Sequence, residues 1–396
     1  MKVAWIILHS FEMFYPEYRN KYKESGALDY EIICKQDHAI HRYCKAAQME
    51  GIESEVYYLS QYEKTVREFT HKYGHKIKRV PINAGGGKYG KEITFTLLKE
   101  LKKDTFHIIF VVPFYLNRII DMFDLLALFC RTNKYPFIPI YSGDTFLGLP
   151  PLRRLSKRFF LNLSDKIFVQ SKAEIKVLEK YAKIRREKII YFNNPVMLDV
   201  FSIIPKEIAA KKLGYDPLKR YILYVGRLSR EKGVHHILNI LPSLIKIDQN
   251  IAALIIGYGP EGKRLRLQVK DKELDNHVSF MGMIPYEDLP LYYNLADIFV
   301  LPSYFEGKPS VLQEALACNT PSIGTTVGGV PEVLSNGVGL LVPPGDENRL
   351  FDAIKQILKG RFEINRTKRM QLLEEYSMQN VGKRLKEICE EVLNEH

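Results

Sequence analysis

The sequence is poor in cysteine and shows no arrangement that would pair the few it has. Its five cysteines stand at positions 34, 44, 130, 318 and 389, and no C-x-x-C pair occurs. This spacing favours neither a structural zinc site nor a disulfide framework. A reducing, cytoplasmic compartment is therefore the expected one.

Long apolar runs are also absent. The N-terminal run, residues 1–8, stops at His9, and the longest other run, residues 106–116, is broken by Pro113. Neither approaches the roughly 18 apolar residues of a membrane-spanning helix, and the N-terminal run lacks the length and the cleavage site of a signal peptide. We expect residues 1–8 to form the first strand of a domain.

Acidic residues are outnumbered by basic ones. The chain has 46 Asp and Glu against 58 Lys and Arg, which gives a net charge of +12. An excess of basic residues suits the binding of nucleic acid, of an anionic membrane or of phosphorylated small molecules. No DNA-recognition helix or aromatic RNA-binding motif accompanies the charge, so nucleic acid is not an expected partner.

The 396 residues exceed what one ordinary core holds, so two domains of similar size are expected. Apolar runs suited to buried strands alternate with helical spacing in both halves, which indicates an α/β fold of doubly wound, Rossmann-like domains. We predict an N-terminal domain over residues 1–193, a second over residues 194–380 and a C-terminal helix over residues 381–396. Residues 60–79 are interpreted as a polar connection, and residues 202–218 as part of the crossing between the domains.

One stretch of the second half carries two glutamates after a buried strand. The apolar run 297–302 ends at Pro302, and Pro309 with the apolar residues behind it predicts a helix start. Glu306 then lies on the connecting loop, and Glu314 lies in the second helical turn. We expect both carboxylates at the carboxyl end of a parallel sheet, beside free helix-start amides, where open α/β sheets bind ligands.

A second loop offers positive charge at the same kind of position. The first strand of this half ends in Gly226, and Arg227 and Lys232 follow before a helix start near Gly233. Backbone amides and two cations could neutralise a diphosphate there. The loop is not a P-loop, because the sequence G-K-[ST] is missing.

The two stretches, in their order along the chain, resemble the retaining, family-four glycosyltransferases of GT-B fold. This family is also described as glycosyltransferase group 1. The resemblance rests on the spacing from Glu306 to Glu314, on the Gly-Arg-x(4)-Lys-Gly loop, and on residues 315–318, 328–332 and 339–346 in their order. It is strong over about residues 220–350 and weak before residue 165. It implies two Rossmann-like domains facing across a cleft, with the acceptor on the first domain, the donor on the second, and a last helix that crosses back to the first.

The resemblance also implies an activity. A hexosyltransferase-type enzyme would move a sugar from a UDP-, GDP- or ADP-sugar to a glycan, a lipid-linked molecule or a small molecule, with retention of configuration. Many other transferases hold a metal ion with an Asp-x-Asp sequence, which is absent from this chain. Neither a metal nor a further cofactor is therefore expected in the reaction.

By resemblance, Arg227 and Lys232 neutralise the departing diphosphate, and Glu306 contacts the sugar and helps to stabilise positive charge. Glu314 holds the ribose, and Tyr258 has a passive place near the base. The residues expected to bind substrate are Gly226, Tyr258, Gly307, Lys308, Ser310, Val311, Glu314 and His9.

The first half departs from the family. Many members have a histidine at the end of the strand that corresponds to residues 106–112, where this chain has Val111 and Val112, and His107 stands at the start of that strand. His9 is either a replacement in the cleft or a structural residue. Two alternative functions follow: a catalytically silent subunit that binds nucleotide-sugar, or a nucleotide-sugar epimerase or glucan phosphorylase of similar shape.

The helix from Arg153 to Phe160 is basic, with apolar residues between the charges. It could lie on an anionic membrane and bring the enzyme to a lipid-linked acceptor at the inner membrane face. A solvated structural face is the other interpretation.

Overall fold

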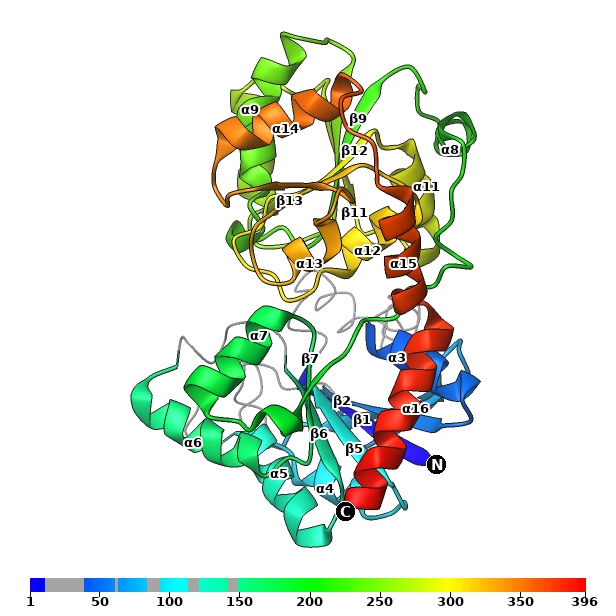
Figure 1. The fold of residues 1–396 in the computed structure, drawn as a ribbon, viewed down its shortest axis with the longest axis vertical. Helices are drawn as coiled ribbons and strands as arrows, with labels where there is room; N and C mark the ends of the chain where they lie inside the picture. The colour runs from blue at the N-terminus through cyan, green and yellow to red at the C-terminus, as the bar shows by residue number, and fades with distance from the viewer. Residues whose placement is uncertain (11–38, 61–62, 84–92, 113–120, 142–148) are drawn as a thin grey trace. The chain divides into compact units, whose positions relative to one another are not determined.

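The computed structural model describes residues 1–10, 39–60, 63–83, 93–112, 121–141 and 149–396. The chain forms two compact units, Met1–Pro195 together with Met378–His396, and Val196–Ser377. Each unit is a sheet of mainly parallel strands covered by helices (Figure 1). None of the helices in these residues combines the length and the apolar character that a bilayer crossing demands.

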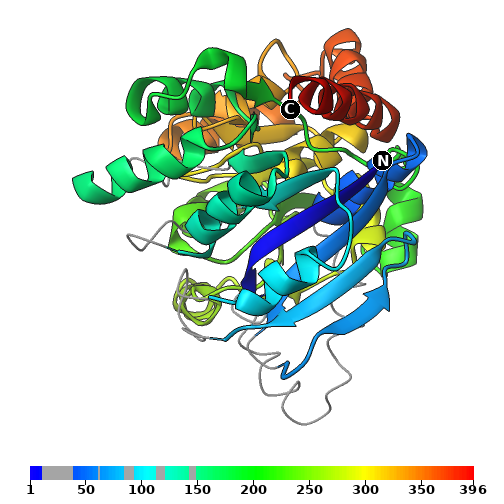
Figure 2. The same ribbon diagram turned by 90° about the horizontal axis from the view of Figure 1, so that it is seen from below.

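Within the described residues, the sheet of the first unit has eight strands in the order β3-β4-β2-β1-β5-β6-β7-β8. Figure 2 shows β1, in dark blue, in the interior of this sheet. Every pairing is parallel except β3 with β4, which is antiparallel. The strands are β1 (Lys2–Ser10), β2 (Glu53–Ser60), β3 (Arg67–Thr70), β4 (Lys76–Pro81), β5 (Ile108–Val112), β6 (Phe137–Tyr141), β7 (Ile167–Val169) and β8 (Ile189–Tyr191).

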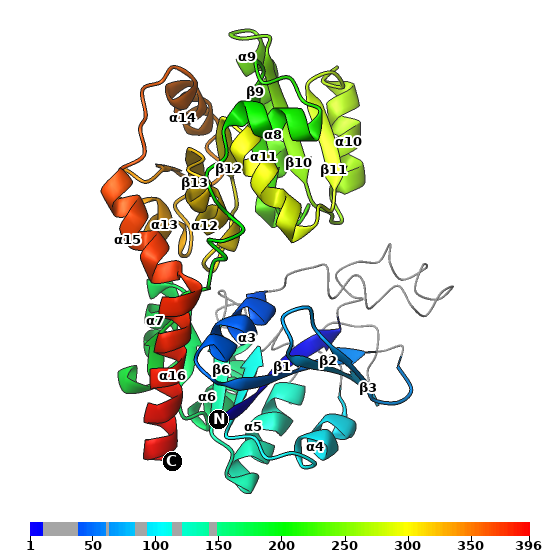
Figure 3. The ribbon, with the colours of Figure 1, turned by 90° about the vertical axis from the view of Figure 1, so that its right-hand side faces the viewer.

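Alternating residues of these strands form two separate hydrophobic clusters, because successive side chains of a strand point to opposite faces of the sheet. Ala4 and Ile6 pack with the helices α4 (Phe95–Leu101), α5 (Met122–Asn133), α6 (Pro151–Asn162) and α7 (Lys172–Val177). Val3 and Trp5 pack with α3 (Ala39–Met49) and α16 (Met378–Glu395), which lie beside each other in Figures 1 and 3. The last helix of the chain thus completes the core of the unit in which the chain begins.

The second unit has a six-stranded parallel sheet in the order β11-β10-β9-β12-β13-β14. Its strands are β9 (Arg220–Val225), β10 (Ile251–Ile256), β11 (Val278–Gly282), β12 (Ile298–Leu301), β13 (Ser322–Thr325) and β14 (Leu340–Val342). Its helices are α8 (Lys206–Leu213), α9 (Val234–Ile245), α10 (Gly262–Asp271), α11 (Leu289–Leu295), α12 (Ser310–Ala317), α13 (Val330–Leu334), α14 (Glu347–Leu358) and α15 (Arg366–Tyr376). The helices α9 to α14 each follow a strand in the chain, as the predicted α/β alternation requires, whereas α15 follows α14 and packs against α12.

Two stretches interpreted as connections are regular structure. Residues 202–218 contain α8, which packs beside α11 within the second unit (Figure 3), so the crossing predicted there is wrong. Residues 60–79 contain β3 and most of β4. The interpretation of residues 60–79 as a connection is wrong because β4 buries charged side chains in ion pairs. Lys78 lies 3.3 Å from Glu55, and Arg79 lies 3.1 Å from Glu63.

Not all basic side chains of the helix α6 point into solvent. Lys157 is fully buried, and its Nζ donates hydrogen bonds to Asp121 Oδ2 at 2.6 Å and Asp124 Oδ2 at 2.5 Å. Both aspartates belong to the N-terminal capping box of α5. Burial and then the neighbouring Asp121 charge raise the pKa of Asp124 to about 6, although the attraction of Lys157 opposes the rise.

Replacing Lys157 should therefore destabilise the first unit. In Lys157→Met two buried carboxyl groups lose their cation, and we expect the free energy of unfolding to fall by about 3–5 kcal/mol. The matched control is Arg158→Met, whose exposed side chain on the same helix should change stability by about 0.5 kcal/mol or less. Chemical denaturation of the two variants measures the difference, and Lys157→Met combined with Asp124→Asn should recover part of the loss.

Candidate functional site

Three loops meet at the carboxyl edge of the second sheet. β9 lies between β10 and β12, and because all three strands are parallel, the loops that follow them open on the same edge. These loops are residues 226–233, 257–261 and 302–309. The motifs identified in the sequence therefore occupy one region, although the last of these loops begins about 76 residues after the first.

The loops after β9 and β12 are joined by an ion pair. Lys232 Nζ donates to Glu306 Oε1 at 2.7 Å, and Ser303 Oγ donates to the same oxygen at 2.7 Å. The backbone amide of Tyr304 donates to the carbonyl of Glu231 at 2.7 Å. The side chain of Lys232 is 24% exposed and that of Glu306 is 8% exposed. A positive charge is thus held at the sheet edge with part of its surface open.

The loops after β9 and β10 are joined through the backbone. The amide of Leu228 donates to the carbonyl of Tyr258 at 2.7 Å, and the amide of Glu261 donates to the carbonyl of Leu228 at 2.9 Å. Tyr224 Oη donates to the carbonyl of Arg227 at 2.8 Å. Tyr258 is 40% exposed and Arg227 is half-buried. A second cation and an aromatic ring therefore stand on loops whose backbones are fixed to each other.

Gly328 allows a fourth loop to approach the Glu306 loop. A Cβ atom at Gly328 would lie 1.7 Å from the carbonyl oxygen of Glu306, and the residue has a φ of +50°. The neighbouring amide of Gly329 donates to the carbonyl of Gly307 at 2.6 Å. Only glycine fits such a contact, so the loop after β13 braces the loop that carries Glu306.

The helix α12 begins at Ser310, and Pro309 is its N-cap residue. Ser310 and Val311, in its first turn, are partly exposed. Glu314 is 3% exposed, and its Oε2 accepts a hydrogen bond from Tyr293 Oη at 3.0 Å. Burial and the charge of Glu314 raise the pKa of Tyr293 well above its ordinary value, so this hydroxyl stays a donor at neutral pH.

Two predicted site residues, Lys308 and His9, do not belong to the exposed part of this sheet edge. Lys308 is 4% exposed, and its Nζ lies 4.8 Å from the centroid of the Tyr376 ring, so it packs inward where Lys232 points to the edge. His9 belongs to β1 of the first unit, and its side chain lies outside the described residues. The geometry around the sheet edge therefore includes Lys308 only as a buried neighbour.

Sequence reasoning missed a polar network behind the edge. His236, 7% exposed, lies 2.7 Å through Nδ1 from Glu347 Oε1 and 2.8 Å through Nε2 from Tyr304 Oη. Asn239 Nδ2 donates to the same Glu347 oxygen at 2.7 Å. Burial opposes ionisation of Glu347, but these hydrogen bonds hold the pKa of its carboxyl below the usual value. No spacing in the sequence signals this network, because His236 and Glu347 are 111 residues apart.

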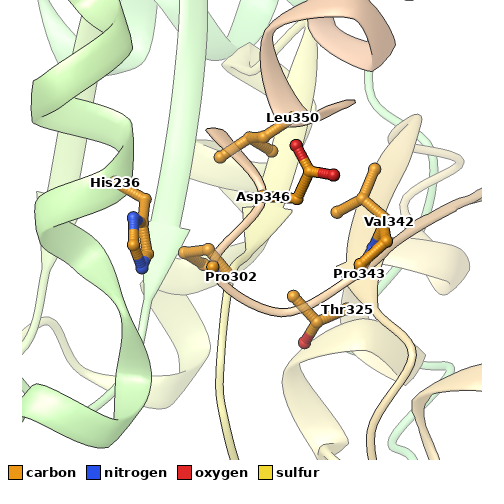
Figure 4. Close-up of a pocket in the computed structure, with 8 residues that line it drawn as sticks. His236, Pro302, Thr325, Val342, Pro343, Asp346 and Leu350 are labelled. Carbon is orange, nitrogen blue, oxygen red and sulfur yellow. The ribbon is translucent and has the colours of Figure 1, made fainter. Parts of the chain in front are cut away.

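A small pocket lies beside this network. Figure 4 shows His236 with Pro302 on one side and Val342 with Pro343 on the opposite side, while Leu350, Asp346 and Thr325 lie between these two sides. Tyr304, which contacts His236, belongs to the loop of Glu306. The network thus ties α9 and α14 to that loop.

Two parallel α/β units with loops of this kind define the GT-B class of fold, and the solved structures agree. Sucrose-phosphate synthase from Thermosynechococcus elongatus superposes with a TM-score of 0.73 at 19% identity, covering 100% of both chains. The Anabaena HepE protein in complex with UDP superposes with a TM-score of 0.72 at 15% identity, covering 99% of this chain and 100% of that one. At such identities the likeness shows the fold.

Residues 205–375, nearly the whole second unit, match the family model "Glycosyl transferases group 1". This part of the chain thus resembles a group 1 glycosyltransferase domain. The Bacillus subtilis protein TuaC, whose name assigns it to teichuronic acid biosynthesis, is 37% identical over 149 residues, which are 38% of this chain and 36% of TuaC. D-inositol 3-phosphate glycosyltransferase of Mycolicibacterium smegmatis is 29% identical over 216 residues, 53% of this chain and 49% of that protein. The chain thus spans about a third to a half of the length of these curated relatives.

The close approach at Gly328 can be tested against a glycine that differs only in its surroundings. Gly360 also has a positive φ, +66°, but a Cβ there would meet nothing within 4 Å. We expect Gly360→Ala to cost about 1–2 kcal/mol for its backbone conformation, and Gly328→Ala to cost about 1–3 kcal/mol more because the Glu306 loop must move. Denaturant unfolding compares the two variants, and equal losses would argue against the bracing contact.

Proposed function

We propose that the chain is a retaining glycosyltransferase that moves a sugar from a nucleotide-diphospho-sugar to an acceptor without a metal ion. The observation that carries the proposal is the Lys232–Glu306 pair at the sheet edge, where Lys232 remains partly exposed. A cation and a carboxylate side by side suit the two opposite charges that develop when a glycosyl phosphate bond breaks. The proposal makes the second unit the donor side and the first unit the acceptor side.

Arg227 and Lys232 would neutralise the departing diphosphate. Positive groups fixed in place before the reaction stabilise developing negative charge without reorganisation, which is the task of a metal ion in other transferases. Lys232 would exchange part of its contact with Glu306 for a phosphate oxygen. Glu306, released from a full ion pair, would face the sugar and stabilise its oxocarbenium character.

The other residues would position the donor. Glu314, fixed by Tyr293 on α12, suits the ribose hydroxyls, and the backbone at Gly307, Ser310 and Val311 suits the sugar and phosphates. Tyr258 stands on the adjacent loop with an exposed ring, in a passive place near the base. Gly226 opens the loop that carries Arg227. His9 remains a proposed acceptor-side residue, and buried Lys308 a proposed support of the helix start.

In the reaction, the bond from the anomeric carbon to the diphosphate oxygen would break, and a bond from the same carbon to the acceptor oxygen would form on the same face. The acceptor proton would pass to a phosphate oxygen of the leaving diphosphate. Both electrons of the broken bond stay with the diphosphate, so charge and atoms balance.

The similar proteins are associated with different nucleotides, so they do not identify the base of the donor. HepE has been crystallised with UDP and with UDP-glucose, whereas a related mannosyltransferase of Corynebacterium glutamicum is named for its dependence on GDP-mannose. UDP-, GDP- and ADP-sugars are therefore all candidate donors. The acceptor would be a glycan, a lipid-linked molecule or a small molecule.

The first test is a thermal-shift screen of the chain against UDP-, GDP- and ADP-sugars with EDTA present, followed by measurement of nucleotide release. We expect one nucleotide class to stabilise the protein. Lys232→Ala should lower nucleotide release about 100- to 1,000-fold, because one fixed charge at the reacting centre is lost. The control is Lys270→Ala on α10, an exposed lysine that should leave release unchanged.

The outcomes separate the alternatives. Stabilisation of the protein by a nucleotide-sugar without release of nucleotide, for every acceptor tried, would favour the catalytically silent subunit. This alternative was raised by Val111 and Val112 at the end of β5, which are buried and partly buried. Dependence on free phosphate would favour a phosphorylase, and interconversion of the donor sugar an epimerase. Product of inverted configuration, or a requirement for a divalent ion, would refute the proposed mechanism.

We also infer that α6 rests on an anionic membrane at the inner, cytoplasmic face. Its exposed side carries Leu152, Leu155 and Phe159, which are 64%, 64% and 58% exposed and follow the i, i+3, i+7 spacing of one helix face. Arg158 is exposed beside them. Apolar side chains with a flanking cation are the composition that binds the interface of anionic lipids.

Vesicle binding tests this contact. Leu155→Ser with Phe159→Ser should weaken binding to vesicles of anionic phospholipid about tenfold or more, because two exposed apolar side chains lose their lipid contact. Leu267→Ser, which changes an exposed leucine of α10, is the control. Equal binding of all three proteins would show that α6 is not the contact surface.

A further inference from the structure

Three buried histidines come together in the first unit, whereas the candidate site described above belongs to the second unit. His41 lies in the first turn of α3, whereas His71 and His75 flank the turn between β3 and β4. The amide of His71 donates to the carbonyl of His75 at 2.9 Å, and the amide of Gly74 donates to the carbonyl of His71 at 2.8 Å. Their exposed fractions are 0%, 2% and 2%. A short hydrogen-bonded turn thus presents two imidazoles to a third one on a helix.

One ring nitrogen of each histidine lies within 4.8 Å of the corresponding atoms of the other two. His41 Nδ1 is 2.8 Å from His75 Nε2, and the ring centroids of His41 and His71 are 4.1 Å apart. Three nitrogens about 2.0–2.1 Å from a tetrahedral zinc ion stand roughly 3.3 Å from one another. The three rings are stacked, with interplanar angles of 12°, 21° and 23°, so the rings would have to rotate for their lone pairs to meet at one metal ion.

The chemistry of the cluster suits a transition metal. His75 Nδ1 is buried and has no hydrogen-bond partner within the described part of the chain. His41 Nε2 lies 3.0 Å from Tyr58 Oη, the kind of outer contact that orients a ligating ring. Imidazole ligands suit zinc, copper or nickel, whereas magnesium and calcium prefer oxygen.

We propose that His41, His71 and His75 bind one divalent transition-metal ion of the zinc type, with a fourth position filled by a small exogenous ligand. Lys45 and Lys72 lie over the ring of Tyr73 at 5.1 Å and 5.2 Å, and that ring contacts His71 at 4.7 Å. This positive surrounding favours an anion, hydroxide or chloride, in the fourth position. The ion fastens the β3–β4 turn to the start of α3 and so acts on the stability of the first unit, separate from sugar transfer.

The sequence contained a partial signal for this site. His71 and His75 are separated by three residues, a spacing found in zinc-binding pairs, but the third ligand stands 30 residues earlier on a helix. The cysteines alone gave no reason to expect a metal.

The full-length protein, treated with EDTA and dialysed, is titrated with Zn²⁺ and with Co²⁺. We expect about one equivalent of metal per chain and a rise in Tm of about 5 °C when zinc exceeds its Kd about a hundredfold. His71→Gln and His75→Gln should each weaken binding about 100-fold or more. His107→Gln, which alters an exposed histidine of the same unit, is the matched control and should bind as the unaltered protein does.

Zinc binding that is equal in the unaltered chain and in the double variant His71→Gln, His75→Gln would overturn the proposal. If these variants do not fold, the unaltered protein decides: Co²⁺ at one equivalent should give the visible absorption bands of a nitrogen-ligated, four-coordinate ion, and their absence would refute the site. Because nucleotide-sugar binding is expected to survive EDTA, failure of this site and failure of the proposed activity give different results.

Discussion

Parallel strand pairing in the second unit is the constraint on which the candidate site depends. It sends the ends of β9, β10 and β12 to one edge, so their loops must share a small volume. Backbone hydrogen bonds join these neighbouring loops directly. The amide of Leu228 donates to the carbonyl of Tyr258 at 2.7 Å, and the amide of Tyr304 donates to the carbonyl of Glu231 at 2.7 Å. The ion pair of Lys232 with Glu306 follows from that arrangement, because residues 74 positions apart are brought within hydrogen-bond distance.

The same fold shows how charge is tolerated in an α/β core. Lys157 is fully buried because two aspartates of one capping box accept its hydrogen bonds, and Glu314 is buried beside a tyrosine hydroxyl. An unpartnered charge in either place would lose several kcal/mol of solvation. Each of these two buried charges therefore has a hydrogen-bonding partner, and removing that partner would leave the charge without compensation for its lost solvation.

Much of the secondary structure could be predicted, and the failures have physical causes. The apolar runs at residues 1–8 and 297–302 and the strand that ends before Gly226 were predicted as strands, and they form β1, β12 and β9. No strand was predicted over Ser322–Thr325 or Leu340–Val342, because three or four residues carry too little pattern to identify. β4 was missed because its charges are neutralised by residues of other segments.

The α/β class of the fold, the alternation of its elements and the loops that carry Arg227, Lys232, Glu306 and Glu314 can be inferred from the sequence alone, because these depend on local periodicity and on motifs of short span. Which residues meet depends on tertiary packing. It paired Lys232 with Glu306, joined His236 to Glu347, buried Lys157 while exposing Leu155, and gathered His41 with His71 and His75. Each of these depends on the packing of segments about 30 or more residues apart, and the free energy of such packing comes from burial and partner geometry that no local stretch of sequence contains.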